Sequence, residues 1–516
     1  MGVVGVQGQV TYSWRNDQNG SFNWAETSPI FWWRGYAEVP AGNEILTFDG
    51  NNGLISTNNL VNTSRFRIFF NNTNSPASRT LNGVTTNTFF DFSSNEPQIV
   101  NNSGVQHTIN FPFNNGNSTG TNRLELLANS GNLTFGGAIG AVGGNRTLVA
   151  GGAGQITFNS VISGTSPNTL TFLREGGGVA RLNAIHTYTG QTQIDNGEVW
   201  IESGGGIATG SGIFVGNGSQ VTNTAKLWLS NATGGTTFSN NFTINQGNAS
   251  TREIGGLNTS GTHTFSGNIT NNSTTGGLLL STINTGGSVN YSGILSGGGA
   301  YNINGPGTSI FSGTSANTFT GLTLINAGTL VLNKTAGVIA IPTNTTISTG
   351  ATIRTDAANQ WGTGTPPLVT LNGNAILNLN NFNQRIALAS ASSTSSVTLG
   401  SATLEINNTG NDPYAGVISG TGGLIKANIG TQTLSGVNTY AGSTTISANG
   451  GILRISADNN LGAAPATPTP GHITLTGSST VADPATLEVN GTFTLNSNRG
   501  IAITGVAGNG PRISVT

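Results

Sequence analysis

Internal repetition is the feature of this sequence that most restricts its fold. One pattern occurs three times: an aromatic residue, then a glycine, then an alternating apolar run. The copies occupy 186–201, 317–332 and 438–455, and their aromatic residues are Tyr188, Phe319 and Tyr440. Each copy is too short to bury its own apolar residues, so it must stack on neighbouring segments. The repeats therefore predict an architecture of stacked units.

Apolar residues alternate with polar ones in many short runs. The period of two is clear at 225–229, 329–332 and 486–489, and it is typical of a β-strand with one buried face. Clusters of Gly, Asn and Ser, which favour tight turns, separate these runs. No extended window keeps the apolar period of a helix. We therefore predict an all-β chain with almost no helix.

Strand, turn and strand follow one another within each copy, and parallel stacking of such units would build successive coils. Ile194, Val199 and Ile201 would then point inward and continue apolar columns of the neighbouring coils. At roughly 20–25 residues per coil, a usual length for solenoid repeats, the sequence predicts a right-handed parallel β-helix, or solenoid. We expect this body to occupy 51–516 and a separate segment to occupy 1–50.

Few residues carry charge. Charged residues make up 7% of the 516 residues and the net charge is −1, whereas about 25% is usual for soluble domains. Polar residues are mainly Asn, Gly, Thr and Ser. A near-neutral chain has no electrostatic footprint for nucleic acid or an anionic membrane. No apolar stretch is long enough for a transmembrane helix, so no membrane insertion by this segment is predicted.

Aromatic residues concentrate in the segment 1–50, which includes Trp24, Phe31, Trp32 and Trp33. A β-helix must cover its open end, because an exposed coil is a template for association with another chain. We therefore predict that this aromatic-rich segment is an N-terminal cap. The alternative is an assembly contact that docks onto the end of another subunit and produces a head-to-tail filament.

Several motifs resemble a known family. The motifs at 416–426, 432–446 and 460–462 together resemble the autotransporter-associated β-strand repeat of bacterial surface β-helical passengers. The resemblance implies an exported β-helical protein at the cell surface or outside the cell, and it implies no catalytic residues. The motif at Arg385 is followed by the repeat aromatic Tyr440, but Thr516 is reached before an equivalent repeat could follow Arg499. We expect the β-helix to be truncated at its C-terminal end, with the family's anchoring region absent.

One cluster of side chains is a candidate binding surface. Glu198, Trp200 and Glu202 alternate with buried positions and share an outward face, and Trp228 is predicted one coil above Trp200. These four residues are candidate glycan contacts, although a solvated face is the favoured interpretation. Glu198 and Glu202 lie about 13 Å apart along an extended strand. That separation exceeds the roughly 5–9.5 Å of glycosidase carboxylate pairs, which disfavours a hydrolase.

A second interpretation of the same region is a polysaccharide lyase, which would need Arg174, Arg181, Glu198 and Trp200 in one groove. Dispersal of these side chains would instead favour a structural role. The four His residues are far apart in sequence, and no metal site is predicted. His186 occupies the repeat position of Asn317 and Asn438, which indicates a structural role in a turn.

These observations favour a non-enzymatic bacterial protein, secreted or at the cell surface, that acts as a stalk, an adhesin or a structural fibre subunit. Candidate partners are cell-surface or extracellular glycans and other copies of the chain. No cofactor and no nucleic-acid partner is predicted. The two alternatives are a self-assembling head-to-tail filament subunit and a carbohydrate-active β-helix enzyme similar to a polysaccharide lyase.

Overall fold

A computed structural model describes most of the chain from residue 98 onward and eight short segments before it. The described ranges are 11–14, 21–23, 45–48, 54–58, 63–64, 67–71, 78–83, 90–91, 98–115, 123–141, 144–164, 169–208, 210–216, 223–245, 251–477, 484–505 and 510–516. Within these ranges the regular structure is β-strand, apart from the single 3-10 turn η1 (Asp458–Leu461). The prediction of an all-β chain is therefore confirmed. The predicted boundary near residue 50 and most of the N-terminal segment lie outside the described residues.

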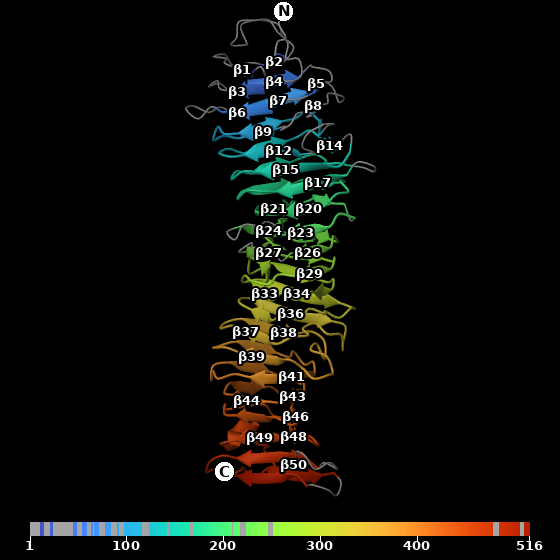
Figure 1. Ribbon diagram of the computed structural model, residues 1–516. Coiled ribbons are helices and arrows are strands. Elements are labelled where there is room, and N and C mark those ends of the chain that lie inside the picture. Colours follow the sequence, from blue (N-terminus) through green and yellow to red (C-terminus); the bar gives the residue numbers. More distant parts are fainter. Residues whose placement is uncertain are drawn as a thin grey trace, which may run out of the picture. The chain divides into compact units, whose positions relative to one another are not determined.

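The chain divides into two compact units. Unit 1 comprises Met1–Asn231 and Phe238–Ile254, and unit 2 comprises Ala232–Thr237 and Gly255–Thr516. In each unit, parallel strands follow one another in columns, as Figure 1 shows for β12, β15 and β17 of unit 1. Each unit is thus a stretch of parallel β-helix, which confirms the predicted fold class. Strands β25 (Thr237–Phe238) and β27 (Thr251–Gly256) contain residues at the boundaries between the units.

Unit 1 has three faces, each formed by in-register strands. The first face consists of β1 (Thr11–Trp14), β3 (Ile45–Phe48), β6 (Arg67–Phe70), β9 (Gln98–Asn101), β12 (Arg123–Ala128), β15 (Arg146–Gly151), β17 (Leu170–Arg174), β20 (Thr192–Ile194), β23 (Ile213–Val215) and β26 (Phe242–Ile244). The second consists of β2 (Ser21–Asn23), β4 (Leu54–Asn58), β7 (Arg79–Gly83), β10 (His107–Ile109), β13 (Leu133–Phe135), β16 (Ile156–Phe158), β18 (Val179–Leu182), β21 (Gly197–Ile201) and β24 (Thr224–Leu229). The third consists of β5 (Thr63–Ser64), β8 (Phe90–Asp91), β11 (Phe113–Asn115) and β14 (Ile139–Ala141), and of the separate pair β19 (Ile185–His186) and β22 (Gly206–Ile207).

Unit 2 has the same kind of columns. One contains β30 (Leu278–Thr282), β33 (Tyr301–Asn304), β35 (Thr323–Ile325), β37 (Thr345–Ile347), β39 (Leu368–Leu371), β41 (Gln384–Ala389), β43 (Leu404–Asn407), β46 (Leu424–Ala427), β48 (Thr444–Ile446), β50 (Thr469–Thr476) and β52 (Arg499–Thr504). A second contains β28 (Thr262–Phe265), β31 (Ser288–Tyr291), β34 (Thr308–Gly313), β36 (Thr329–Lys334), β38 (Thr352–Thr355), β40 (Ile376–Asn378), β42 (Ser396–Thr398) and β45 (Val417–Ser419). The remaining strands are β29 (Ile269–Asn271) with β32 (Leu295–Ser296), and β44 (Asn411–Tyr414), β47 (Thr431–Leu434), β49 (Ile452–Ile455), β51 (Thr486–Val489) and β53 (Arg512–Val515).

Strand register gives the length of a coil. Leu124 of β12 lies opposite Leu148 of β15, and Lys426 of β46 lies opposite Ile446 of β48. These pairings agree with the predicted coil of roughly 20–25 residues, a usual length for solenoid repeats. Coils with an inserted loop are longer, because the extra residues lie in the loop and the strands on either side still pair with their neighbours.

The core of each unit consists of side chains stacked from coil to coil. The predicted inward residues Ile194, Val199 and Ile201 are fully buried. Aromatic rings stack in the same way: the ring centroids of Phe135 and Phe158 in unit 1 and those of Phe265 and Tyr291 in unit 2 are 5.5 Å apart. Because each coil covers the apolar side chains of the next, no single repeat needs a core of its own.

Candidate functional surface on the second face of unit 1

The predicted tryptophan pair lies on adjacent strands. In the pairing of β21 with β24, Trp200 lies opposite Trp228 and Glu198 lies opposite Lys226. The prediction that Trp228 lies one coil from Trp200 is therefore confirmed. Glu202 follows the end of β21 and its side chain is partly exposed. We use the name Trp200 face for the set Arg181, Glu198, Trp200, Glu202, Lys226 and Trp228.

Two cations pack on the tryptophan rings. On the neighbouring strand β18, Arg181 lies opposite Trp200, and its guanidinium carbon is 4.2 Å from the ring centroid. The ammonium nitrogen of Lys226 is 5.7 Å from the centroid of the Trp228 ring. Cations over an indole face are attracted by its quadrupole, which contributes about 0.5–1 kcal/mol at exposed sites. Arg181, Trp200 and Trp228 therefore lie in register on three successive strands, and Lys226 lies beside the last ring on the same strand.

Glu198 connects the two indoles. Trp200 Nε1 donates to Glu198 Oε2 at 2.7 Å, and Trp228 Nε1 donates to the same oxygen at 3.1 Å. Trp228 is only 3% exposed, whereas Trp200 is half-buried. Of the two rings, only Trp200 therefore offers surface to a ligand, and Trp228 supports it from the next coil.

The charges of the Trp200 face are paired. Arg181 Nη1 donates to Glu202 Oε1, and Lys226 Nζ lies 3.1 Å from Glu253 Oε2 and 3.9 Å from Glu198 Oε1. The hydroxyl of Ser230 donates to Glu202 Oε2 at 2.6 Å. With both glutamates held by cations and neutral donors, the face presents little net charge to an incoming ligand.

Arg174 does not belong to this surface. Its side chain is fully buried, and its guanidinium donates to the carbonyls of Ala150 at 2.5 Å, Gly152 at 3.1 Å and Gly178 at 3.2 Å. Burial lowers the pKa of Arg174 to about 10. The lyase interpretation predicted a groove that contains all four residues, and for Arg174 this prediction is wrong. Arg181, Glu198 and Trp200 come together on the outside, whereas Arg174 points into the core and binds turn carbonyls.

Lys426 has the same role in the third repeat, a role that sequence reasoning missed. Its position relative to Tyr440 is the same as that of Arg174 relative to Tyr188. Its ammonium donates to the carbonyls of Ala427, Asn428 and Gly450 at 2.7–2.8 Å. Burial lowers the pKa of Lys426 to about 8. The sequence does carry a signal for this role, because both cations lie at the same spacing before the repeat aromatic. Each of them also follows a buried residue by two positions on a strand.

His186 is a structural residue, as predicted. It is fully buried, and its Nδ1 accepts a hydrogen bond from the backbone N–H of Ile162 at 3.0 Å. At the same repeat position, Asn317 Oδ1 accepts from Leu295 and Asn438 Oδ1 accepts from Ile418. In all three repeats this side chain therefore connects to the backbone of the preceding coil.

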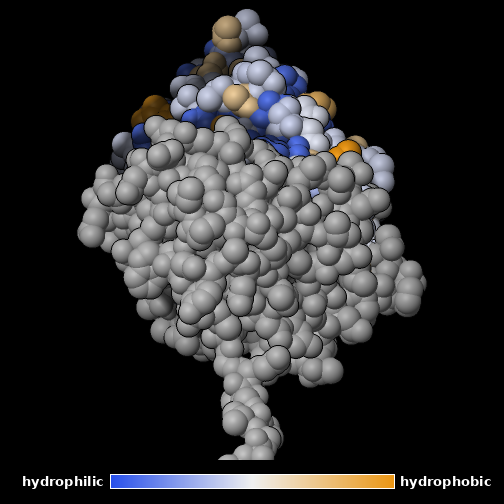
Figure 2. All heavy atoms as spheres, turned by 90° about the horizontal axis from the view of Figure 1, so that it is seen from above, coloured by the Kyte–Doolittle hydropathy of each residue, from blue (hydrophilic) through white to orange (hydrophobic). Residues whose placement is uncertain are grey.

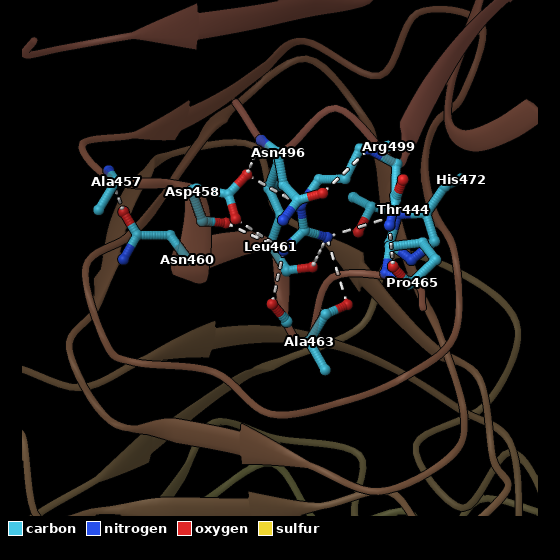
Figure 3. A network of polar contacts seen from close by, with 12 residues as sticks. Thr444, Ala457, Asp458, Asn460, Leu461, Ala463, Pro465, His472, Asn496 and Arg499 are labelled. Carbon is cyan, nitrogen blue, oxygen red and sulfur yellow. Dashed lines mark hydrogen bonds and ion pairs between the residues drawn. The ribbon is translucent and has the colours of Figure 1, made fainter. Parts of the chain in front are cut away.

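A larger polar network, also missed from sequence, lies in the last described coils (Figure 3). Arg499 at the start of β52 pairs with Asp458 of η1, with Arg499 Nε 3.0 Å from Asp458 Oδ1. The guanidinium also donates to the carbonyls of Leu461 at 3.0 Å and Gly462 at 2.7 Å. His472 Nδ1 lies 3.5 Å from Arg499 Nη1, and burial together with this nearby positive charge lowers the pKa of His472. The network fastens the loop that follows η1 to the next coil.

In the end-on view of Figure 2, the coloured residues are mostly hydrophilic, and apolar ones stand singly. Among the described residues, no group of three or more His, Asp or Glu could hold a metal ion. No helix in the described ranges is long and apolar enough to cross a membrane. The candidate assembly residues Trp24, Phe31, Trp32 and Trp33 lie outside the described residues.

The fold and this surface together define a class of protein: a parallel β-helix built from repeats whose characteristic side chains connect one coil to the next. The family description that matches the chain is the passenger-associated-transport-repeat, at 174–201, 304–332 and 424–455. These matches include the three repeats at 186–201, 317–332 and 438–455. The chain thus contains three segments that match the passenger-associated-transport-repeat, in agreement with the sequence resemblance.

One curated relative also matches. The chain is 33% identical over 171 residues to the adhesin BmaC autotransporter of Brucella suis biovar 1 (strain 1330). The match covers 32% of this chain and 4% of the length of that protein. No solved structure matches the chain significantly.

Proposed function

We propose that this chain is a non-enzymatic segment of a passenger, secreted or displayed at the cell surface, that serves as a stalk or an adhesin. The observation that carries the proposal is the use of the repeat-defining side chains. His186, Asn317 and Asn438 bind backbone of neighbouring coils, and Arg174 and Lys426 bind turn carbonyls. Their chemistry stabilises the stack rather than forming a catalytic site.

The Trp200 face fits the same proposal. A lyase needs a free base near a cation that neutralises the sugar acid, whereas Arg181 and Glu202 are paired with one another. A face of this kind supports binding by many weak contacts along a rigid surface, for which simultaneous engagement supplies the affinity. The name of the relative from Brucella suis adds support for adhesion, since it is an adhesin.

The test is surface display of the chain on a non-adherent bacterial host, followed by counting of bacteria retained on a host-cell monolayer. We expect retention above that of the same host with an empty display anchor, and competition by the purified chain. Retention equal to the empty anchor would leave only the stalk role. Release of unsaturated uronates from polygalacturonate by the purified chain would overturn the non-enzymatic assignment, and concentration-dependent filaments in electron micrographs would indicate the fibre subunit instead.

A further inference from the structure

The Trp200 face continues a longer column on the second face of unit 1. The strands β10, β13 and β16 pair in parallel, with Thr108, Thr134 and Thr157 in register. Thr157 is followed in the same column by Arg181 of β18 and then by Trp200 of β21. We use the name hydroxyl track for the three threonines together with Gln106 and Gln155. The track is therefore separated from the half-buried indole of Trp200 by one strand, at Arg181.

The outward positions of these three strands and of the residues that flank them carry no charge. The segments 106–110, 132–136 and 155–159 read QHTIN, NLTFG and QITFN. The second and fourth residues of each segment are buried, and the others are partly or fully exposed. All nine outward residues are thus Gln, Asn, Thr or Gly. The face between Thr108 and Thr157 is rich in hydrogen-bonding groups and has neither charge nor apolar surface.

Two of the three threonine hydroxyls are oriented by glutamine side chains. Gln106 Nε2 donates to Thr134 Oγ1 and Gln155 Nε2 donates to Thr157 Oγ1, each at 3.0 Å. Gln155 Oε1 in turn accepts from Arg181 Nε at 2.8 Å. A hydroxyl that accepts one hydrogen bond keeps its own hydrogen and a second lone pair. Successive coils therefore present donors and acceptors about 4.8 Å apart, the spacing of paired strands.

We propose that the hydroxyl track and the exposed part of Trp200 bind an extended neutral glycan that lies across successive coils. A neutral polysaccharide offers one set of hydroxyl donors and acceptors per sugar and apolar C–H groups for the indole. A protein partner is disfavoured because its interface core needs apolar or aromatic residues, and the track has none. An acidic polysaccharide is disfavoured because the nearby cations, Arg181 and Lys226, are paired with carboxylates.

This inference rests on the adhesin role proposed above and specifies its ligand class. The probe is a series of cello-oligosaccharides from the disaccharide to the hexasaccharide, with hydroxyethylcellulose as polymer and polygalacturonate as acidic comparator, measured by calorimetry and affinity electrophoresis on the whole chain. A neutral glycan array extends the probe beyond one linkage. We expect binding to neutral glycans that tightens with oligosaccharide length, because each added sugar reaches another coil.

The variant is the pair Thr134→Val and Thr157→Val, which removes two hydroxyls and keeps the β-branched shape. The matched control is Thr346→Val with Thr370→Val, an in-register pair that is equally half-buried on strands of unit 2. We expect the affinity to fall on the order of tenfold in the variant and to stay within about twofold in the control. A further variant, Trp200→Leu, should weaken the longer oligosaccharides more than the shorter ones.

Three results would overturn the proposal: no binding to any neutral glycan, preference for polygalacturonate, or equal losses in the variant and the control. Thermal melting of each variant separates loss of binding from loss of folding. Bacterial retention on host cells without glycan binding would leave the adhesin role standing and remove only this ligand. Glycan binding without bacterial retention would leave the glycan ligand standing and remove the adhesin role.

Discussion

One side chain in each repeat connects three successive coils in unit 2 and only two in unit 1. Asn438 accepts from the N–H of Ile418 and donates to the carbonyl of Asn460 at 2.7 Å. Asn317 does the same between Leu295 and Ala340. In unit 1, His186 Nδ1 accepts from Ile162, but its buried Nε2 has no partner among the described residues. A buried polar atom without a partner costs about 1–3 kcal/mol. His186 is thus the weakest of the three connections.

The first prediction is that His186→Asn stabilises unit 1. An amide can both accept and donate here, as at the two equivalent positions, so the substitution should raise the free energy of unfolding by about 0.5–1.5 kcal/mol. Urea denaturation followed by tryptophan fluorescence measures the change. The reverse substitution Asn317→His is the control and should destabilise unit 2. Equal effects of the same sign would contradict the argument.

The second prediction concerns acid. Burial lowers the pKa of His186 from its usual 6.5 to about 4. Between these values the unfolded chain binds a proton that the folded chain does not, so the free energy of unfolding should fall as the pH decreases from 6.5 to 4 and change no further from this group below pH 4. His186→Asn should lack this component. Urea midpoints of both proteins at pH 7 and pH 4 test it; a constant difference between them would disprove the assignment.

At the scale of strands and turns, the repeat aromatic fixes the start of the next strand. Tyr440 Oη and Thr444 Oγ1 are 2.7 Å apart, and Tyr188 and Thr192 have the same contact and distance. The second repeat has Phe319 at this position. Its ring is also buried, so at this position the ring packs without the hydroxyl contact. In the first and third repeats, the hydroxyl contact between Tyr and Thr therefore adds to the packing of the buried aromatic ring.

The third prediction is a coupling of about 0.5–1.5 kcal/mol between Tyr440 and Thr444. In a double-mutant cycle, Tyr440→Phe and Thr444→Val should each destabilise the chain, because each leaves a buried hydroxyl without its partner. The double variant should cost less than the sum of the two. Chemical denaturation of the four proteins gives the coupling. The pair Phe319 and Thr323, with Thr323→Val, is the matched control, for which no coupling to the ring is expected.

The strand pattern was predictable and the fate of its charged residues was not. Alternation placed Ile194, Val199 and Ile201 inward correctly. The same parity on β17 makes Leu170, Phe172 and Arg174 an inward set. The lyase interpretation instead needed Arg174 in one groove with Arg181 and Glu198. Strand parity therefore accounts for the burial of Arg174 but not for its carbonyl partners, two of which belong to the preceding coil. Trp228 is buried although parity places it outward with Lys226, so its burial does not follow from a local pattern.

The fourth prediction tests the Arg499 network, which fastens η1 to β52. Arg499→Met should destabilise these last coils by about 2–3 kcal/mol, near the lower limit for breaking a buried pair, because Asp458 is partly exposed. Asp458→Asn is the milder control, since an amide oxygen still accepts from the guanidinium. Hydrogen exchange of η1 and β50 is the measurement. Equal protection in both variants would show that the ion pair is not what orders the loop.

At the scale of the whole molecule, stability should be local. In stacked repeats each coil contacts only its neighbours, so a lost connection weakens adjacent coils more than distant ones. The chain offers a direct comparison, because units 1 and 2 each contain residues that connect coils, at His186 and Asn438 respectively. A protein with one global cooperative transition would instead spread the loss over all strands.

The last prediction follows from this locality. Asn438→Ala leaves the N–H of Ile418 and the carbonyl of Asn460 without their partner, at a cost of about 2–4 kcal/mol for two buried groups. Hydrogen exchange should quicken in β45 and β48 and stay unchanged in β12 and β15 of unit 1. His186→Ala should give the reciprocal result: hydrogen exchange should quicken near β19 and stay unchanged in β45. Uniform loss of protection in either variant would mean that the repeats unfold as one cooperative body, because only then does a broken contact in one coil lower the stability of every other.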